Sequence, residues 1–374
     1  MNTFLSSAQQ AQLEQFRAFA REHVMPQAPA LVKHEACLKE FLQMLGQKGY
    51  LGLNVPTEYG GHGGNLLDVI LFMEAVGEHE PGLGLTIGNH AAVIEVVKKY
   101  GTEQQKSRYL PLLARGDGFA TLAFSEPTAG TDFESVNATV DAKSSLSGEK
   151  TWVVTGDFAT LFLVLAKKAE SAELGLYLVD RATDATFKLN SEHQLIGLRS
   201  AYINDIEFLQ TQLSADASVS ASEPARELAL YAMAVSKVVL SAAAVGLMES
   251  GTDLALEHAR ERKQFGTAIG QFQGVQWKLA DMSVDTTAAR LLTYRAAWSH
   301  EESPAEFAKD AAMCKWYAGR GARTETGEAV QILGASGLDQ GNPLSRFYGD
   351  GKVMEIAQGT AEFQKMLLVK ELNI

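Results

Sequence analysis

The sequence predicts a mixed α-and-β chain built as a helical part, a β-strand part and a second helical part. Helical hydrophobic spacing dominates up to about residue 118, strand-like apolar runs follow between about 119 and 222, and a long proline-poor helical region closes the chain. The length of 374 residues is enough for two or three packed units. We therefore expect domains at 1–118, 119–222 and 223–374.

The first zone carries the signals of helix starts and of one buried helical face. Ser7 with Gln10 and Thr102 with Gln105 have the spacing of capping boxes, and Pro111 is expected to end the second of these helices. Apolar side chains share one face of the first helix: Leu13, Phe16, Ala20 and Val24.

The middle zone has the chemistry of strands. Ser135–Ala142 alternates polar and apolar residues, which is typical of a half-buried strand. Leu161–Ala166 and Leu174–Val179 are short apolar runs and predict buried strands. Ser214–Arg226 is small and polar, and predicts a loop that closes this zone.

The third zone predicts long helices packed in a bundle. No proline occurs between Pro224 and Pro304, so helices can run there without interruption. Apolar residues recur at spacings of three and four, as in the seam of a bundle helix: Leu228, Tyr231, Val235, Val238, Ala242 and Val245.

Composition excludes several classes of protein. A formal charge of −12 disfavours broad attraction to nucleic acid or anionic lipid. The two cysteines, Cys37 and Cys314, fit a reducing compartment. The first residues lack the pattern of a targeting segment. The apolar stretch Leu228–Met248 contains Lys237 and predicts a buried helix rather than a membrane span. We expect a cytoplasmic protein.

General catalytic motifs are missing from the sequence. It contains no GxxxxGK[ST] phosphate loop, no HExxH and no CxxC, and its eight histidines are scattered, so no metal site is expected. Gly82, Gly84 and Gly88 have the wrong spacing for a dinucleotide fingerprint.

Six more specific motifs nevertheless occur in order along most of the chain. They are GYLGLNVPTEYGG (Gly49–Gly61), KYGTEQQKSRYLPLLARGD (Lys99–Asp117), FSEPTAGTD (Phe124–Asp132), ERKQFG (Glu261–Gly266), QILGASG (Gln331–Gly337) and QGTAE (Gln358–Glu362). With these motifs the sequence resembles the acyl-CoA dehydrogenase family. That resemblance implies an N-terminal helical domain, a middle β-barrel and a C-terminal four-helix bundle, assembled as a homo-oligomer (a dimer or a tetramer). It also implies FAD as the cofactor.

The resemblance implies a flavin site between the middle domain and the C-terminal helices. Phe124 and Ser125 correspond to the strand that lines the flavin ring, and Thr131 to a hydroxyl residue near the pyrophosphate. Trp152 corresponds to the aromatic residue that packs on the flavin; the alternative is an ordinary core tryptophan. Thr155 is the nearest hydroxyl to the position, here Val154, at which relatives bind flavin N5.

Further FAD ligands are expected from the C-terminal domain. Arg262, Phe265 and Gln273 resemble residues that reach the FAD of a partner subunit, and the planar guanidinium of Arg262 suits a pyrophosphate. The alternative for Arg262 is a solvated surface charge. Candidates for the adenine end and the diphosphate, each of which could instead be structural, are Gln331, Gly334, Thr360 and Glu362.

The catalytic base of the family is missing from both of its usual places. Gln358 stands where a Glu is usual, before Gly359, and an amide cannot take up a proton near neutral pH. The other placement of the Glu corresponds to Ser236, beside Lys237. We expect Ser236, Lys237 and Gly359 to contact substrate. We expect Gln358 to line the reacting end of the pocket, with its backbone N–H as a donor to the thioester carbonyl.

Three functions remain open. The first is an FAD-dependent α,β-dehydrogenase of an acyl thioester, or the reverse enoyl reductase. The second is a flavin-dependent monooxygenase or oxidase, which needs no α-proton base. The third is a catalytically silent acyl-thioester-binding homologue. The expected partners are an acyl-CoA or acyl-carrier-protein thioester and an electron-transfer flavoprotein, without nucleic acid.

Overall fold

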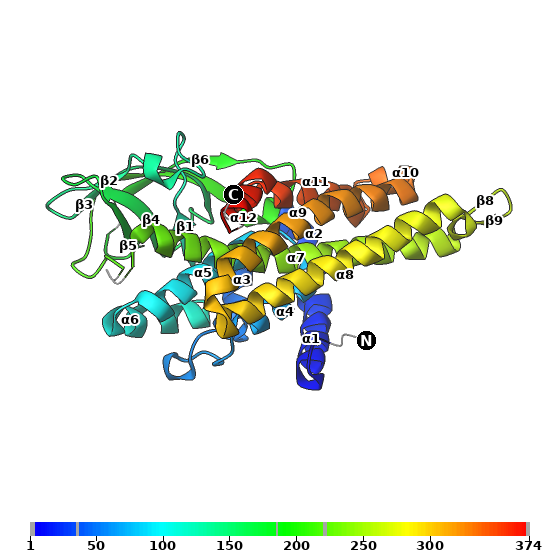
Figure 1. The fold of residues 1–374 in the computed structure, drawn as a ribbon, viewed down its shortest axis with the longest axis horizontal. Coiled ribbons are helices and arrows are strands. Elements are labelled where there is room, and N and C mark those ends of the chain that lie inside the picture. Colours follow the sequence, from blue (N-terminus) through cyan, green and yellow to red (C-terminus); the bar gives the residue numbers. More distant parts are fainter. Residues whose placement is uncertain (1–3, 35–36, 185, 220–222, 372–374) are drawn as a thin grey trace.

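The computed structural model describes residues 4–34, 37–184, 186–219 and 223–371. Figure 1 shows the sheet at one end of the molecule, with helices from both ends of the chain beside it, and the predicted order of helical, strand and helical parts along the sequence is confirmed. The helices are α1 (Ser7–Phe19, continued by a π-helical turn over Ala20–Val24), α2 (Ala28–Val32), α3 (Leu38–Gln47), α4 (Leu66–Gly77), α5 (Leu83–Tyr100), α6 (Glu103–Arg115), α7 (Ala225–Glu261), α8 (Gln273–Glu302), α9 (Pro304–Leu333), α10 (Ala335–Leu338), α11 (Pro343–Ile356) and α12 (Ala361–Glu371).

Three helix starts in the described part of the first zone use capping boxes, one of them Asn65 with Asp68 at α4. The box of α1 is formed by Ser6 and Gln9, one residue earlier than predicted at both positions. The box of Thr102 and Gln105 is confirmed at the start of α6. The expected stop at Pro111 is wrong. The helix continues for one more turn because that turn buries apolar side chains, which offsets the backbone hydrogen bond that proline cannot donate.

The middle zone folds into one seven-stranded sheet in the order β1-β4-β2-β3-β7-β6, with β5 paired to β4. Strand β4 is buried on both faces: Leu161, Leu163 and Leu165 belong to the main core, and Phe162 and Val164 to a second apolar cluster. This double burial explains the uninterrupted apolar run. The strands are β1 (Ala120–Ala123), β2 (Thr139–Val140), β3 (Ser145–Val154), β4 (Leu161–Lys168), β5 (Leu174–Asp180), β6 (Phe187–His193) and β7 (Ile203–Gln212).

The strand predicted over 135–142 is only two residues long. The alternation is real, because Val136 and Ala138 are buried. The buried carboxylate of Glu126, however, accepts the N–H of Asn137 (2.6 Å) and the N–H of Ala138 (2.9 Å). These backbone donors are thereby satisfied by a side chain, and the ladder begins only at Thr139.

Helix α7 forms the centre of the molecule. It packs against α4, α5, α8 and α9, and α4 crosses it closely because both helices carry a glycine at the crossing. A Cβ at Gly246 would lie 2.1 Å from the carbonyl oxygen of Glu74, and one at Gly77 would lie 2.3 Å from that of Ala243. Within the described residues, α7 is also the one helix long and apolar enough to span a membrane, but its apolar window is 83% buried in the protein. It is a core helix, as predicted.

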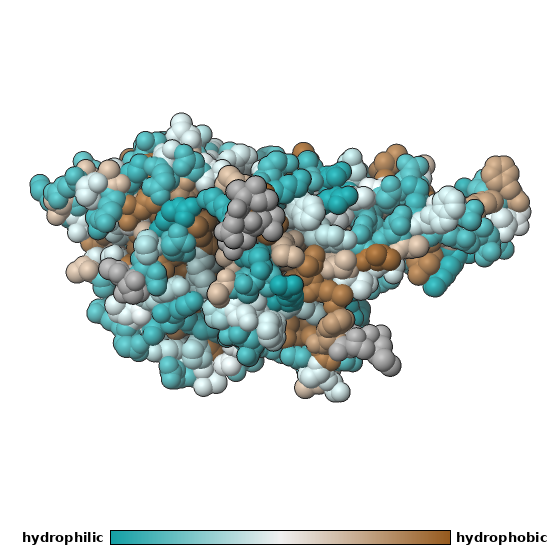
Figure 2. Space-filling view, viewed as in Figure 1, coloured by the Kyte–Doolittle hydropathy of each residue, from teal (hydrophilic) through white to brown (hydrophobic). Residues whose placement is uncertain are grey.

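The C-terminal helices extend far beyond the sheet. Figure 1 shows α7 and α8 running to a hairpin at the opposite end of the molecule, formed by β8 (Lys263–Gln264) and β9 (Thr267–Ala268). Figure 2 shows apolar side chains along the bundle and at this tip. Several large apolar side chains of the bundle are exposed in one chain: Phe265, Trp277, Val284, Trp298, Leu338 and Tyr348.

Candidate functional site

Three polar side chains from distant parts of the sequence meet at one amide oxygen. Asn89 lies on α5, Ser236 on α7, and Gln358 in the turn between α11 and α12. Asn89 Oδ1 accepts one hydrogen bond from Ser236 Oγ (2.9 Å) and another from Gln358 Nε2 (2.8 Å). The two positions where the sequence led us to look for a carboxylate therefore lie on the same partner, and both hold neutral groups.

The network continues from Asn89 into the sheet. Asn89 Nδ2 donates to Thr121 Oγ1 (3.4 Å), and the Thr121 hydroxyl donates to the carbonyl oxygen of Val154 (2.7 Å). Thr155 donates its hydroxyl to the same carbonyl (2.7 Å) and is buried. The Thr155 side chain thus bonds to the backbone of the preceding residue, and it does not line the pocket described next.

A pocket of about 420 Å³, open to solvent, lies at the polar network, between the sheet and the helices. None of its lining side chains ionises near neutral pH, so the walls supply hydrogen bonds and apolar surface but no acid or base. Among the described residues, no group of three or more His, Cys, Asp or Glu could hold a metal. The lining residues are Asn89, Leu122, Phe124, Ser125, Gly130, Phe133, Thr151, Trp152, Val154, Met233 and Gln358.

Trp152 forms a flat wall of this pocket and is fixed from behind. The Asp205 carboxylate accepts hydrogen bonds from the backbone N–H of Trp152 (3.1 Å), from His193 Nε2 (2.8 Å) and from the hydroxyls of Thr151 and Ser191. Burial raises the pKa of Asp205, but these hydrogen bonds outweigh it and hold the pKa at about 2. The His193 ring stacks on the indole at 4.0 Å and 15°.

This wall stays available to a ligand. Trp152 is 53% exposed and has a φ of 59°, in the left-handed region that costs a non-glycine residue ~1–3 kcal/mol. A core tryptophan would be buried in a relaxed conformation. The strained backbone of Trp152 and its exposed side chain, held by Asp205, favour a binding role over a packing role.

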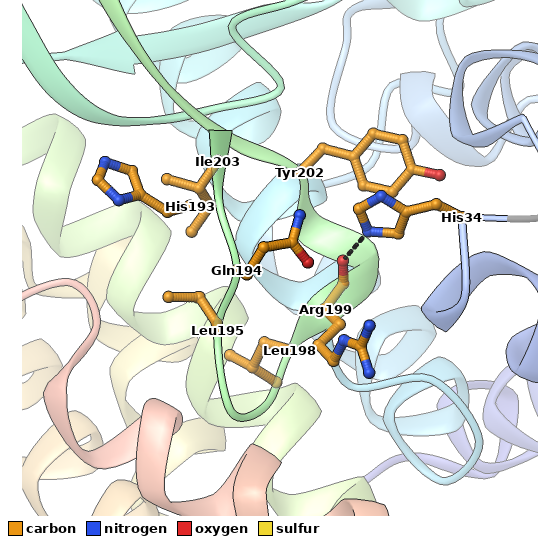
Figure 3. Close-up of a pocket in the computed structure, with 8 residues that line it drawn as sticks. All are labelled: His34, His193, Gln194, Leu195, Leu198, Arg199, Tyr202 and Ile203. Atoms are coloured by element: carbon orange, nitrogen blue, oxygen red, sulfur yellow. Dashed lines mark hydrogen bonds between the residues drawn. The ribbon is translucent and has the colours of Figure 1, made fainter. Parts of the chain in front are cut away.

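The loop after His193 is anchored by a second aromatic contact. Figure 3 shows a narrow cavity with His34, Arg199 and Tyr202 on its sides. His34 Nε2 donates to the carbonyl oxygen of Arg199 (2.9 Å), and the His34 ring lies on Tyr202 at 4.0 Å. This packing fixes the segment between β6 and β7, and through it the position of His193.

A larger pocket of about 720 Å³ adjoins the first one at Phe133. The 131–134 loop, the start of α7 and α12 form its walls. Arg226 Nε lies 3.8 Å from Glu134 Oε1 across it, and Lys370 adds a second cation. The lining residues are Thr131, Asp132, Phe133, Glu134, Arg226, Leu230, Phe363, Met366, Leu367 and Lys370.

The turn that carries Gln358 is held tightly. Gln358 has a φ of 59° and Gly359 a φ of 96°. Gln364 Nε2 donates to the carbonyl oxygen of Gly359 (2.8 Å). Lys315 Nζ donates to the carbonyl oxygen of Met354 (2.8 Å) at the end of α11. These contacts fix the backbone before and after the Gln358 side chain.

Lys237 lies behind this turn and not on the pocket surface. Its Nζ is 5.2 Å from the centre of the Phe363 ring, and the residue is buried. Burial lowers the pKa of Lys237 to about 8. Lys237 lines neither of the two pockets, but it contacts Phe363, which lines the larger one.

Five of the remaining predicted FAD ligands lie away from the pocket within one chain. Arg262 and Phe265 lie at the tip beside the β8–β9 hairpin, where Phe265 is 96% exposed, and Gln273 begins α8. Gln331 and Gly334 lie at the end of α9, next to α10. Figure 1 shows both regions far from the sheet. Thr360 and Glu362 follow Gln358 directly at the start of α12.

Sequence reasoning missed Asn89, Thr121, Asp205 and His193. Asn89 and Thr121 are buried polar residues in otherwise apolar segments, and that contrast is a usable signal because buried polar groups need partners. His193 ends the edge strand β6 and Asp205 lies on its neighbour β7; both are only partly buried and carry no comparable signal.

The three-part fold, with an aromatic-walled pocket between sheet and bundle, defines the architecture of a flavin-dependent oxidoreductase. The chain matches the family models of the acyl-CoA dehydrogenase N-terminal domain (6–117), middle domain (121–211) and C-terminal domain (226–373). It is 30% identical to the mitochondrial isovaleryl-CoA dehydrogenase of Pongo abelii, over 98% of this chain and 89% of that protein. The chain therefore belongs to the acyl-CoA dehydrogenase family.

Two solved structures extend this relationship. The acyl-CoA dehydrogenase of Bacillus anthracis complexed with FAD is 25% identical, with a TM-score of 0.92 over 100% of this chain and 68% of that chain. The prolyl acyl-carrier-protein oxidase AnaB is 28% identical, with a TM-score of 0.92 over 99% of this chain and 100% of that chain. FAD is the cofactor that these relatives support.

The residues of this chain fit a flavin. The exposed and rigid Trp152, the apolar walls of Phe124 and Leu122, and the hydroxyl of Ser125 provide a flat slot with a polar edge. No charge on the lining would oppose a neutral ring.

Proposed function

We propose that the protein is an FAD-dependent oxidoreductase that binds an acyl thioester with its reacting end beside Gln358. The observation that carries this proposal is the pocket at which Gln358, Asn89 and Trp152 meet, because it combines an aromatic wall with a polar end reached by both base positions of the family. Bound FAD would accept the hydride of the substrate. Phe124, Ser125 and Trp152 would hold its ring.

The neutral lining limits the chemistry of this pocket. Dehydrogenation of a simple acyl thioester needs removal of an α-proton, and neither Gln358 nor Ser236 can accept a proton near neutral pH. Loss of a general base costs ~10²–10⁴ in rate. Gln358 can still position the thioester through its backbone N–H. We therefore expect slow α,β-dehydrogenation with unactivated substrates.

The second candidate is an oxidase or monooxygenase on the same fold, in which oxygen is the electron acceptor. The base-free lining supports it, since reoxidation by oxygen needs no α-proton base. The likeness to a prolyl acyl-carrier-protein oxidase supports it as well. An electron-transfer flavoprotein as acceptor belongs to the dehydrogenase alternative.

We assign the larger pocket to the carrier arm of the thioester, coenzyme A or an acyl-carrier protein. It adjoins the reacting end at Phe133, and Arg226 and Lys370 provide cations for an anionic arm, beside the carboxylates of Asp132 and Glu134. Homo-oligomerisation, as a dimer or tetramer, is supported by the exposed Phe265 and by Arg262 beside it, because both could complete the FAD site only of another subunit. A cytoplasmic location remains part of this proposal.

The test is anaerobic titration of the purified yellow holoprotein with butyryl-CoA and longer acyl-CoA thioesters. We expect a shift of the flavin spectrum on binding and slow bleaching. Oxygen uptake after chemical reduction, with and without thioester, separates the second candidate: stimulated uptake favours it. If the flavin spectrum of the holoprotein responds to no thioester, the proposed function is wrong and the chain is a catalytically silent member of the family.

A further inference from the structure

A fixed acceptor sets the direction of the hydrogen bonds between the sheet and Gln358. The carbonyl oxygen of Val154 can only accept, so the Thr121 hydroxyl must point its hydrogen at it over 2.7 Å. Thr121 Oγ1 is then left as an acceptor for Asn89. Asn89 must therefore turn Nδ2 toward Thr121, as observed, and Oδ1 toward α7 and the turn after α11.

The same logic fixes the amide of Gln358. With Asn89 Oδ1 facing it at 2.8 Å, Gln358 must present Nε2, because a flipped amide would bring two acceptor oxygens together. The other end of the amide, Oε1, accepts no hydrogen bond from the residues that the structure describes. Gln358 lines the pocket, so its free acceptor belongs to the pocket wall.

None of the other polar groups of the wall is hydrogen-bonded to this acceptor in the part of the chain that the structure describes. The Thr151 hydroxyl is committed to Asp205, and the Ser125 hydroxyl and the Trp152 indole N–H line the pocket without donating to Gln358. The Asn89 amide already makes three hydrogen bonds, to Thr121, Ser236 and Gln358. An apolar acyl group placed against Gln358 would strip water from Oε1 and leave it without a donor, whereas a donor on the substrate would satisfy it.

We infer that Gln358 Oε1 selects acyl thioesters that carry an O–H or N–H on the α-carbon, and that Val154, Thr121 and Asn89 set this preference by fixing the direction of the amide. This inference rests on the proposed placement of the thioester. It assigns the amide a specificity role that a methylene chain of the same length could not supply, and that an ionised carboxylate could supply only without the hydrogen bond to Asn89.

The test is a comparison of two nearly isosteric probes, 2-hydroxybutyryl-CoA and 2-methylbutyryl-CoA, each as both α-epimers. Dissociation constants are measured by anaerobic calorimetry on the holoprotein. We expect the better hydroxy epimer to bind about tenfold more tightly than either methyl epimer, the worth of one net hydrogen bond. In Gln358→Met, which keeps side-chain length and removes the acceptor, the preference should disappear or reverse, because the hydroxyl then lacks a partner.

A second variant tests the chain of hydrogen bonds from Val154 through Thr121 and Asn89 to Gln358, which we call the relay. Thr121→Val keeps the shape of the buried side chain and removes the hydroxyl that orients Asn89, so the hydroxy preference should fall to about threefold or less. Equal binding of the two probes to the wild type, or an unchanged preference in Gln358→Met, overturns the inference and leaves the proposed function intact. If neither probe nor butyryl-CoA binds, the proposed function fails and the inference fails with it.

Discussion

Gln358→Glu restores the carboxylate of the usual family pattern, and its effect can be worked out from the contact with Asn89. In the wild type Nε2 donates to Asn89 Oδ1 at 2.8 Å. An ionised Glu would face that oxygen as a second acceptor. Asn89 can turn over to donate, but its Oδ1 then faces Thr121, whose hydrogen is held by Val154. One buried pair is left unsatisfied, at about 1–3 kcal/mol.

That free energy raises the pKa of the new carboxyl by about one to two pH units, because one unit corresponds to about 1.4 kcal/mol. A protonated Glu can still donate to Asn89, so the variant keeps its stability at low pH and loses it as pH rises through the raised pKa. The base becomes available over the same range. Butyryl-CoA-dependent flavin reduction in Gln358→Glu should therefore rise with a midpoint above that of an ordinary glutamate.

The assay is stopped-flow flavin reduction between pH 5 and 9, with denaturant unfolding of the same samples. The wild type is the control, since an amide does not titrate. Adding Asn89→Ala removes the opposing oxygen and should move the midpoint back toward lower pH. A midpoint in the ordinary glutamate range for Gln358→Glu alone, with pH-independent unfolding, would refute the reasoning about this relay.

Three further predictions concern the surroundings of the pocket. Asp205→Asn weakens the hold on Trp152, and we expect about tenfold weaker FAD binding by the apoprotein together with altered tryptophan emission; unchanged values would show that the wall needs no support. Arg262→Ala should weaken FAD binding by about tenfold or more, whereas Arg260→Ala, an exposed arginine on the same helix end, should leave it unchanged. Burial lowers the pKa of Lys315 to about 7, so wild-type stability to urea should rise with pH from about 7 toward 10, and Lys315→Met should flatten that rise. If the stability of Lys315→Met to urea rises with pH as steeply as that of the wild type, Lys315 is not the group responsible for the rise.

The fold was predictable wherever hydrophobic period and burial agree. The sequence of β4 is a continuous apolar run because Leu163 faces the main core and Phe162 faces the second cluster. Helix α7 could be predicted as a bundle helix because the apolar residues of its seam are buried. Prediction failed where a side chain replaced a backbone partner. Glu126 accepts hydrogen bonds from the backbone N–H groups of Asn137 and Ala138, and the hydrophobic periodicity of the sequence does not indicate these contacts.

The site divides in the same way. Gln358 and Ser236 could be located because local motifs surround them, but their meeting at Asn89 depends on how α5 and α7 pack, which no motif records. That meeting changes the meaning of the missing carboxylate. If Gln358 were only the remnant of a lost base, its surroundings would be expected to remain complementary to an anion. Instead the group that faces it is an amide oxygen, which suits an N–H donor and repels a carboxylate, and a buried hydroxyl and a backbone carbonyl fix that oxygen in place. The pocket is thus built around the amide, so a search for the substrate should start from hydrogen-bond donors rather than from the acyl chains of the family's ordinary substrates.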